Sequence, residues 1–99
     1  MMDRVEAARL LRREMIRFAR RPPAELARLI DEIDAYEVEG ADGVRYQVEV
    51  EAIWVEEPGG PIQVLAGIDD GSFRGAFLPV TDGFVTRPDD TVDPPMVDQ

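Results

Sequence analysis

The stretch at residues 44–57, VRYQVEVEAIWVEE, is the longest β pattern in the chain and constrains the fold most strongly. Its even-numbered residues are apolar as far as Trp54, whereas its odd-numbered residues are polar up to Glu51 and apolar at Ile53 and Val55. Because successive side chains of a strand point to opposite faces, this pattern predicts one face that is buried along its whole length. Such a strand belongs at the centre of a small sheet. It exceeds the roughly five or six residues of a typical strand, so we expect a bend or bulge within it.

The residues before this stretch are predicted to pair with it as a hairpin. A three-residue loop at 41–43, with Gly43 in the left-handed conformation, sets Val38 opposite Tyr46 and keeps apolar side chains on one face. The alternative, a two-residue Asp-Gly turn, sets Val38 opposite Gln47 and mixes the faces. We therefore prefer the longer loop.

Two further turns are predicted to extend the sheet. A three-residue loop at 58–60 sets Trp54 opposite Val64, which leaves the apolar face intact. The Asp-Gly turn after the third strand then pairs Ile68 with Phe73. Together the three hairpins give a four-stranded antiparallel meander.

Residues 1–20 are predicted to form an amphipathic helix. Asp3 is a suitable N-cap, and Glu6 stands three residues later as its capping-box partner. The apolar stripe is imperfect, because Arg12 lies inside it and Leu10 lies outside it. The opposite face is rich in arginine. It is either a solvated face or a surface that docks an acidic partner or a membrane.

A second helix is predicted to begin at the Pro22-Pro23 pair, since proline ends one helix and is accepted in the first turn of the next. Its apolar residues follow helical spacing at Leu26, Leu29, Ile30 and Ile33. Each helix has one apolar face and needs a flat surface to cover. The predicted fold class is therefore α+β, with two N-terminal helices packed on one face of the four-stranded antiparallel meander and a short C-terminal extension.

The chain is predicted to form a single domain over residues 1–87, followed by a flexible acidic tail over residues 88–99. The tail contains three prolines and four aspartates with few apolar groups, so it cannot offset the entropy of ordering. The N-terminus lacks the layout of a secretory signal, and no apolar run approaches the roughly 18 residues that cross a bilayer. We expect a complete cytoplasmic protein.

Cysteine, histidine and lysine are all absent from the sequence. Their absence excludes disulfides, thiolate and histidine catalysis, lysine Schiff bases and the usual zinc sites. The single serine, Ser72, has no histidine or lysine anywhere in the chain to act as the base that would activate it. The glycines follow no phosphate-binding spacing. We therefore expect no enzymatic activity, no cofactor and no metal.

The net charge of −10 is unevenly distributed. Residues 1–28 carry a net charge of +4, whereas residues 29–99 carry −14. Phosphate repulsion from this acidic body argues against nucleic-acid binding. A basic protein partner suits the body better.

Four glutamates are predicted to project from the odd-numbered face of the first two strands: Glu37, Glu39, Glu49 and Glu51. Neighbouring carboxylates can bind a hard cation, work as an acid/base pair or face a basic protein, and they also occur on solvated faces. A small sheet with two helices leaves little material for a substrate cleft. We therefore favour solvent or a protein partner over catalysis.

Apolar side chains are predicted to gather at the other end of the same face, at Ile53, Val55, Leu65, Ala76 and Leu78. Two alternatives stay open for this patch. Residues 80–87 fold over it, or it binds a partner or a second copy of the chain.

These features predict a small acidic, non-enzymatic protein-interaction module. It would bind a protein partner, favoured to be basic, through the exposed sheet face and would engage neither nucleic acid nor membrane. The alternative is a homodimeric structural protein that associates through the apolar patch or through a strand edge.

Overall fold

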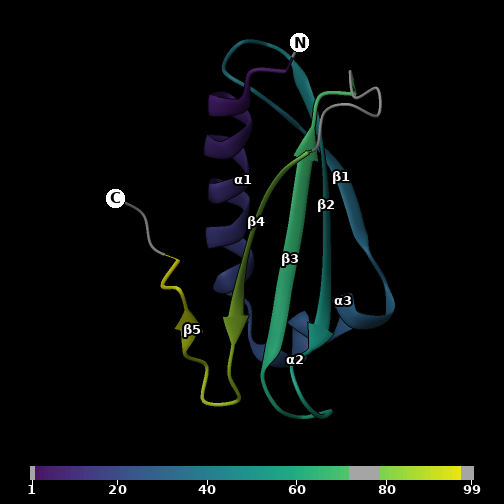
Figure 1. Cartoon of the computed structure of the whole chain (residues 1–99), viewed down its shortest axis with the longest axis vertical. Helices are drawn as coiled ribbons and strands as arrows, with labels where there is room; N and C mark the ends of the chain where they lie inside the picture. Colours follow the sequence, from purple (N-terminus) through teal and green to yellow (C-terminus); the bar gives the residue numbers. More distant parts are fainter. Residues whose placement is uncertain (1, 72–78, 97–99) are drawn as a thin grey trace.

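A computed structural model describes residues 2–71 and 79–96 of the chain. In this part the elements are α1 (Arg4–Ala19), α2 (Pro23–Leu26), α3 (Arg28–Asp31), β1 (Asp34–Glu39), β2 (Arg45–Trp54), β3 (Ile62–Asp69), β4 (Val80–Thr86) and β5 (Val92–Asp93). The described strands form one antiparallel sheet in the order β1-β2-β3-β4-β5 (Figure 1). The α+β class and the antiparallel meander are confirmed.

The first hairpin has the predicted register. Val38 lies opposite Tyr46 and Glu39 lies opposite Arg45. The loop is closed by a hydrogen bond of 3.0 Å from the Gly43 amide to the Gly40 carbonyl, and Gly43 has a φ of 79°. Glycine adopts this left-handed conformation without the steric cost that other residues meet, which explains why the longer loop forms here.

The second hairpin is displaced by two residues from the predicted register. Trp54 pairs with Ile62 instead of Val64, and the connecting loop spans residues 55–61. Its first residue, Val55, donates a hydrogen bond of 3.0 Å to the Pro61 carbonyl. A shift by two residues leaves the same side chains on the same face, so the apolar alternation cannot distinguish the two registers.

The predicted fourth strand is wrong. Ile68 pairs with Val80, and Val64 pairs with Phe84, so β4 lies later in the sequence than the proposed partner Phe73. Phe73 itself lies outside the described residues. Both segments offer apolar residues of suitable spacing, and the hairpin signal of the Asp-Gly pair favoured the shorter connection.

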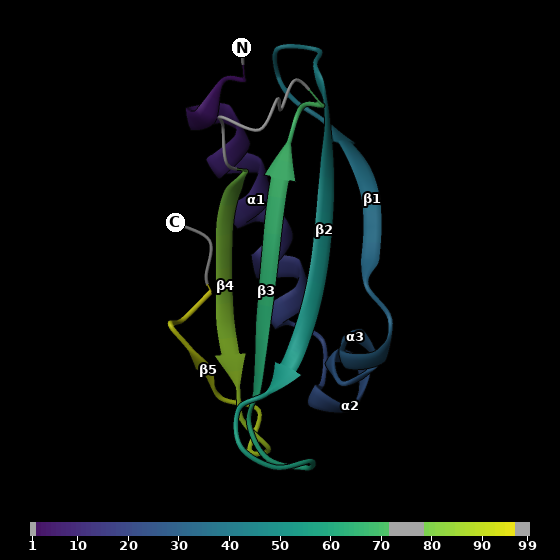
Figure 2. The same cartoon turned by 45° about the vertical axis from the view of Figure 1, so that its right-hand side comes forward.

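Helix α1 packs against β3 and β4 (Figures 1 and 2). Leu10, which the sequence placed outside the apolar stripe, is fully buried, whereas Val5 is 82% exposed. The buried stripe is thus rotated relative to the prediction, because burying the larger leucine in the middle of the helix removes more apolar area from water. The core combines this stripe with the even-numbered residues of the sheet, among them Tyr46, Val48, Val50, Val64, Ile68 and Phe84.

The predicted second helix is two short turns, α2 and α3, that meet at Ala27. Leu26 and Leu29 are buried, but Ile33 is 55% exposed. The chain leaves the helical conformation at Glu32, where φ is −143°, so Ile33 falls beyond the apolar stripe. None of the described helices is long and apolar enough to cross a membrane.

The segment predicted to be a flexible tail contains β5, which pairs with β4, and the buried side chain of Met96. Arg12 donates hydrogen bonds of 2.9 Å to Met96 Sδ and 3.0 Å to Asp82 Oδ1. These contacts explain why an arginine stands inside the apolar stripe of α1. It joins the helix to β4 and to the segment that follows β5.

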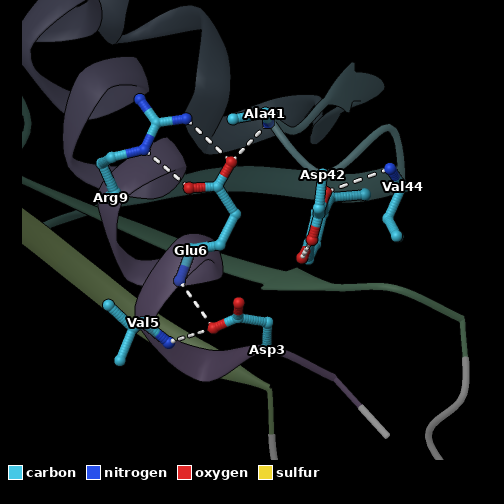
Figure 3. Close-up of polar contacts among 8 residues, drawn as sticks. Asp3, Val5, Glu6, Arg9, Ala41, Asp42 and Val44 are labelled. Atoms are coloured by element: carbon cyan, nitrogen blue, oxygen red, sulfur yellow. Dashed lines mark hydrogen bonds and ion pairs between the residues drawn. The ribbon is translucent and has the colours of Figure 1, made fainter.

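The beginning of α1 is tied to the β1–β2 loop by Glu6 (Figure 3). Asp3 caps the helix as predicted, since its carboxylate accepts hydrogen bonds of 3.1 Å from the amides of Val5 and Glu6. The Glu6 carboxylate does not complete the capping box. It accepts bonds of 2.6 and 2.8 Å from Arg9 and one of 2.6 Å from the Ala41 amide. The Arg9 and Ala41 hydrogen bonds lower the pKa of Glu6 to about 2.

This contact predicts an acid-dependent stability difference. The pKa of Glu6 falls from 4.5 to about 2 on folding, so its contribution is complete above pH 4.5 and is lost as the pH falls towards 2. Glu6→Gln should therefore lower the free energy of unfolding at pH 7 and should lose less stability than the wild type between pH 4.5 and 2. Urea denaturation followed by circular dichroism measures both. Glu56→Gln, which alters an exposed loop carboxylate, serves as the control. Parallel pH profiles for the wild type and Glu6→Gln would contradict the assignment.

Candidate functional site

The odd-numbered residues of the strands share one face of the sheet. All four registers pair odd residues with odd residues, while α1 and the core occupy the even-numbered face. Figure 2 shows α1 on one side of the strands only. In the described part of the chain, no helix covers the odd-numbered face.

The four predicted glutamates divide into two pairs with different surroundings. Glu37 and Glu39 flank Arg45, whose guanidinium lies 3.3 Å from Glu37 Oε1 and 3.8 Å from Glu39 Oε1. Glu49 and Glu51 are exposed on the neighbouring strand and form no ion pair with another described residue. The second pair therefore carries uncompensated negative charge on this face.

A hollow of about 670 Å³ lies over Glu49 and Glu51. Glu49 is opposite Ala35 on β1 and Gly67 on β3, and Gly83 of β4 also lines the hollow. These neighbours have small side chains or none, so the surface of the sheet is recessed beside Glu49. The larger apolar side chains at its border belong to Ile33 and Leu65.

The predicted apolar patch is less continuous than expected. The predicted register would set Ile53 directly opposite Leu65, but Ile53 pairs with Gln63 and Leu65 pairs with Glu51. Ile53, Val55 and Leu65 are 49%, 47% and 36% exposed, respectively. Leu78 and Ala76 lie outside the described residues. The two-residue displacement of β3 thus places polar groups between these apolar side chains.

Residues 80–87 do not fold over this face. Val80 and Phe84 belong to β4 and point into the core side of the sheet, opposite Ile68 and Val64. Val85 lies within the odd-numbered face as part of the same strand. The alternative in which this segment covers the patch is therefore wrong.

Ile33, Gly67 and Gly83 are among the residues of the hollow that the sequence does not identify as site residues. Ile33 follows the helical spacing of the preceding apolar residues and was assigned to the helix. Gly67 lies in the middle of β3, and a mid-strand glycine indicates curvature or a close approach without indicating which residue is its neighbour. Gly83 lies inside β4, although the Asp82-Gly83 pair is typical of a turn.

A second groove, of about 400 Å³, runs between α1 and β1. Its helix side carries Arg13 and Arg17, which lie 3.2 and 3.6 Å from the carboxylate of buried Glu14. The Tyr36 hydroxyl donates a hydrogen bond of 2.9 Å to Glu14 Oε1. Burial and this bond to the carboxylate raise the pKa of Tyr36. The Tyr36 ring also stacks on Phe18, with ring centroids 6.4 Å apart.

Within residues 2–71 and 79–96, no group of three or more potential ligand side chains could hold a metal ion. The arrangement offers carboxylates for electrostatic contact and small residues that admit another molecule's side chains. Comparison with known proteins finds no matching family model, no similar curated protein and no similar solved structure.

The two glycines of the hollow are expected to differ in their response to alanine. A Cβ at Gly83 would overlap the backbone carbonyl oxygen of Val64, whereas a Cβ at Gly67 would meet its nearest atoms at 3.8 Å, an ordinary contact. Gly83→Ala should lower the free energy of unfolding by about 1–3 kcal/mol. Gly67→Ala should stay within about 1 kcal/mol of the wild type. Urea denaturation of both variants gives the comparison, and equal stabilities would be inconsistent with the β3–β4 register.

Proposed function

We propose that the chain is a small, cytoplasmic, non-enzymatic interaction module that binds a basic protein through the odd-numbered face of its sheet. The observation that carries this proposal is the pair Glu49 and Glu51, exposed beside a hollow and without an ion pair to another described residue. Exposed carboxylates keep their hydration, so they contribute little to folding. They are free to meet a positive charge on another molecule.

The composition of the hollow suits an arginine or lysine side chain. Such a side chain packs its aliphatic stem on apolar surface while its charged head reaches a polar group. Leu65 and Ile33 supply apolar surface, and Glu51 lies opposite Leu65 on the neighbouring strand. Arginine would gain further from two hydrogen bonds to one carboxylate.

The charge of the whole chain supports the same partner class. Residues 29–99 carry a net charge of −14, which would attract a basic protein from a distance and accelerate its association. This attraction extends over a Debye length of roughly 8 Å at physiological ionic strength. Complex formation should therefore weaken as salt is added.

Homodimerisation is the second candidate, and it rests on exposed Ile53, Val55 and Leu65. Pairing two odd-numbered faces would bring Glu49 and Glu51 of one copy towards the same carboxylates of the other. Their repulsion makes this association weaker than binding of a basic protein. Sedimentation at high protein concentration tests the candidate, and a purely monomeric chain would rule it out.

The main test is recovery of the partner from the native cell extract by the immobilised chain. Glu49→Gln combined with Glu51→Gln should reduce the recovered partner by at least about tenfold, because each charged hydrogen bond contributes about 1.5–3 kcal/mol. Glu56→Gln combined with Glu57→Gln removes the same charge from the β2–β3 loop and should change recovery little. Retention that is equal for both double variants, or binding that is indifferent to ionic strength, would count against the proposal.

A second test changes the shape of the hollow without changing its charge. Gly67→Leu places a bulky side chain beside Glu49, because its Cβ would meet the nearest atoms at an ordinary contact distance of 3.8 Å and Gly67 lines the hollow. We expect roughly tenfold weaker binding of the recovered partner, measured by isothermal titration calorimetry, with Gly67→Ala as the milder control. Undiminished affinity of a folded Gly67→Leu variant would place the binding surface elsewhere.

A further inference from the structure

The outer edge of β1 is an unpaired strand edge. β1 is the terminal strand of the sheet, and no strand in the described part of the chain lies beyond it. Ala35, Glu37 and Glu39 are exposed, while Tyr36 and Val38 are half-buried. An open edge of this kind exposes backbone donors and acceptors that can pair with another chain.

The register identifies which backbone groups are free. The Gly40 amide donates a hydrogen bond of 2.8 Å to the Val44 carbonyl, so this pair belongs to the hydrogen-bonded set of the antiparallel ladder. Hydrogen-bonded pairs alternate with non-hydrogen-bonded pairs along such a ladder. The even-numbered residues of β1 therefore direct their amides and carbonyls towards β2. The amides and carbonyls of Ala35, Glu37 and Glu39 therefore point towards the open edge.

We propose that the partner adds an extended segment to this edge of β1, with basic side chains beside Glu37 and Glu39 and acidic side chains beside Arg13 and Arg17. The inference rests on the proposed function and gives the mode in which the partner is held. Strand addition obtains its affinity from main-chain hydrogen bonds and its specificity from alternate side chains.

The two sides of an added strand would meet surfaces of different charge. Its side chains on the odd-numbered face would lie next to Glu37 and Glu39, which share the single guanidinium of Arg45. Those on the other face would enter the groove of about 400 Å³ between β1 and α1. There, Arg13 and Arg17 share the single carboxylate of Glu14, and their side chains remain 47% and 68% exposed. The helix side of the groove thus carries more arginine than acid, since Arg21 also lines it, whereas Asp34, Glu37 and Glu39 make its β1 side acidic.

The same charges disfavour a second copy of this chain as the occupant. In an antiparallel pair of two β1 edges, odd-numbered residues of one copy face odd-numbered residues of the other. In the two registers that pair most residues, Glu37 would then lie directly opposite Glu37 of the second copy, or opposite its Ala35 and diagonally across from its Glu37. Like charges in directly opposite positions destabilise strand pairing. The edge therefore favours a segment with alternating basic and acidic residues.

The test uses two capped eight-residue peptides of equal composition as probes. One alternates lysine and glutamate, and the other has four lysines followed by four glutamates. The alternating peptide should bind the isotope-labelled chain at least about tenfold more tightly at low ionic strength. It should also slow hydrogen exchange at the amides of Ala35, Glu37 and Glu39. Equal affinity for the two peptides, or no protection of these three amides, would overturn the proposal.

Ala35→Pro blocks the edge without changing charge. It removes an outward N–H that β2 does not use, and proline is tolerated at such edge positions. The affinity for the alternating peptide should fall roughly tenfold, whereas Ala35→Ser, which keeps the N–H, should bind as the wild type does. Unchanged affinity of Ala35→Pro rejects strand addition. If Ala35→Pro does not fold, the exchange protection of the wild-type amides decides the question.

The two proposals can fail separately. If the Glu49→Gln and Glu51→Gln variant loses the basic partner while Ala35→Pro retains it, the face binds the partner and strand addition is wrong. If Ala35→Pro loses the partner and the glutamine variant retains it, the edge is the binding surface and the proposed role of the hollow is wrong.

Discussion

Burial of the even-numbered face of β2 is the constraint on which the rest of the structure depends. Tyr46, Val48 and Val50 are almost completely buried, and each large apolar side chain of this kind contributes roughly 1.5–3 kcal/mol when removed from water. Because α1 supplies the covering layer, the helix must be held in one position along the sheet. Polar contacts at its two sides do this: Glu6 joins it to the β1–β2 loop, and Arg12 joins it to β4.

The sequence contains enough information for the parts of the fold that depend on local chemistry. The Asp3 cap and the first hairpin follow from short-range geometry, since a left-handed Gly43 selects the loop and the loop selects the register. The β2–β3 register and the identity of β4 depend instead on which segment pairs with each strand. The competing segments carry apolar residues at the same alternate positions. Alternation has a period of two, so it cannot detect a displacement by two residues, and it cannot exclude a strand that begins later.

The candidate site could likewise be predicted only where it depends on the alternation of residues within one strand. The exposure of Glu49 and Glu51 follows from the alternation of apolar and polar residues along β2, which the sequence shows directly. The hollow beside them depends on which residues stand opposite, and Gly67 reaches that position only through the observed β2–β3 register. Ile33 joins the site because α3 ends before it, a boundary that helical spacing alone does not place. Gly67 and Gly83 of the neighbouring strands were therefore missed, while Glu49 and Glu51 of the central strand and Leu65 of β3 were found.

Because the core lies on one side of the sheet, the surfaces left for contact with a partner are the other side and the β1 edge. The odd-numbered face and the β1 edge contribute little apolar burial, so their side chains are constrained less by stability than those of the core. Glu37 and Glu39 illustrate how one feature serves two purposes at such an edge. Like charges at an exposed edge oppose pairing between copies of a chain. In the proposed mode of binding, the same charges would stabilise an added strand that brings lysine or arginine, so protection against self-association and selection of a basic partner would have one physical origin.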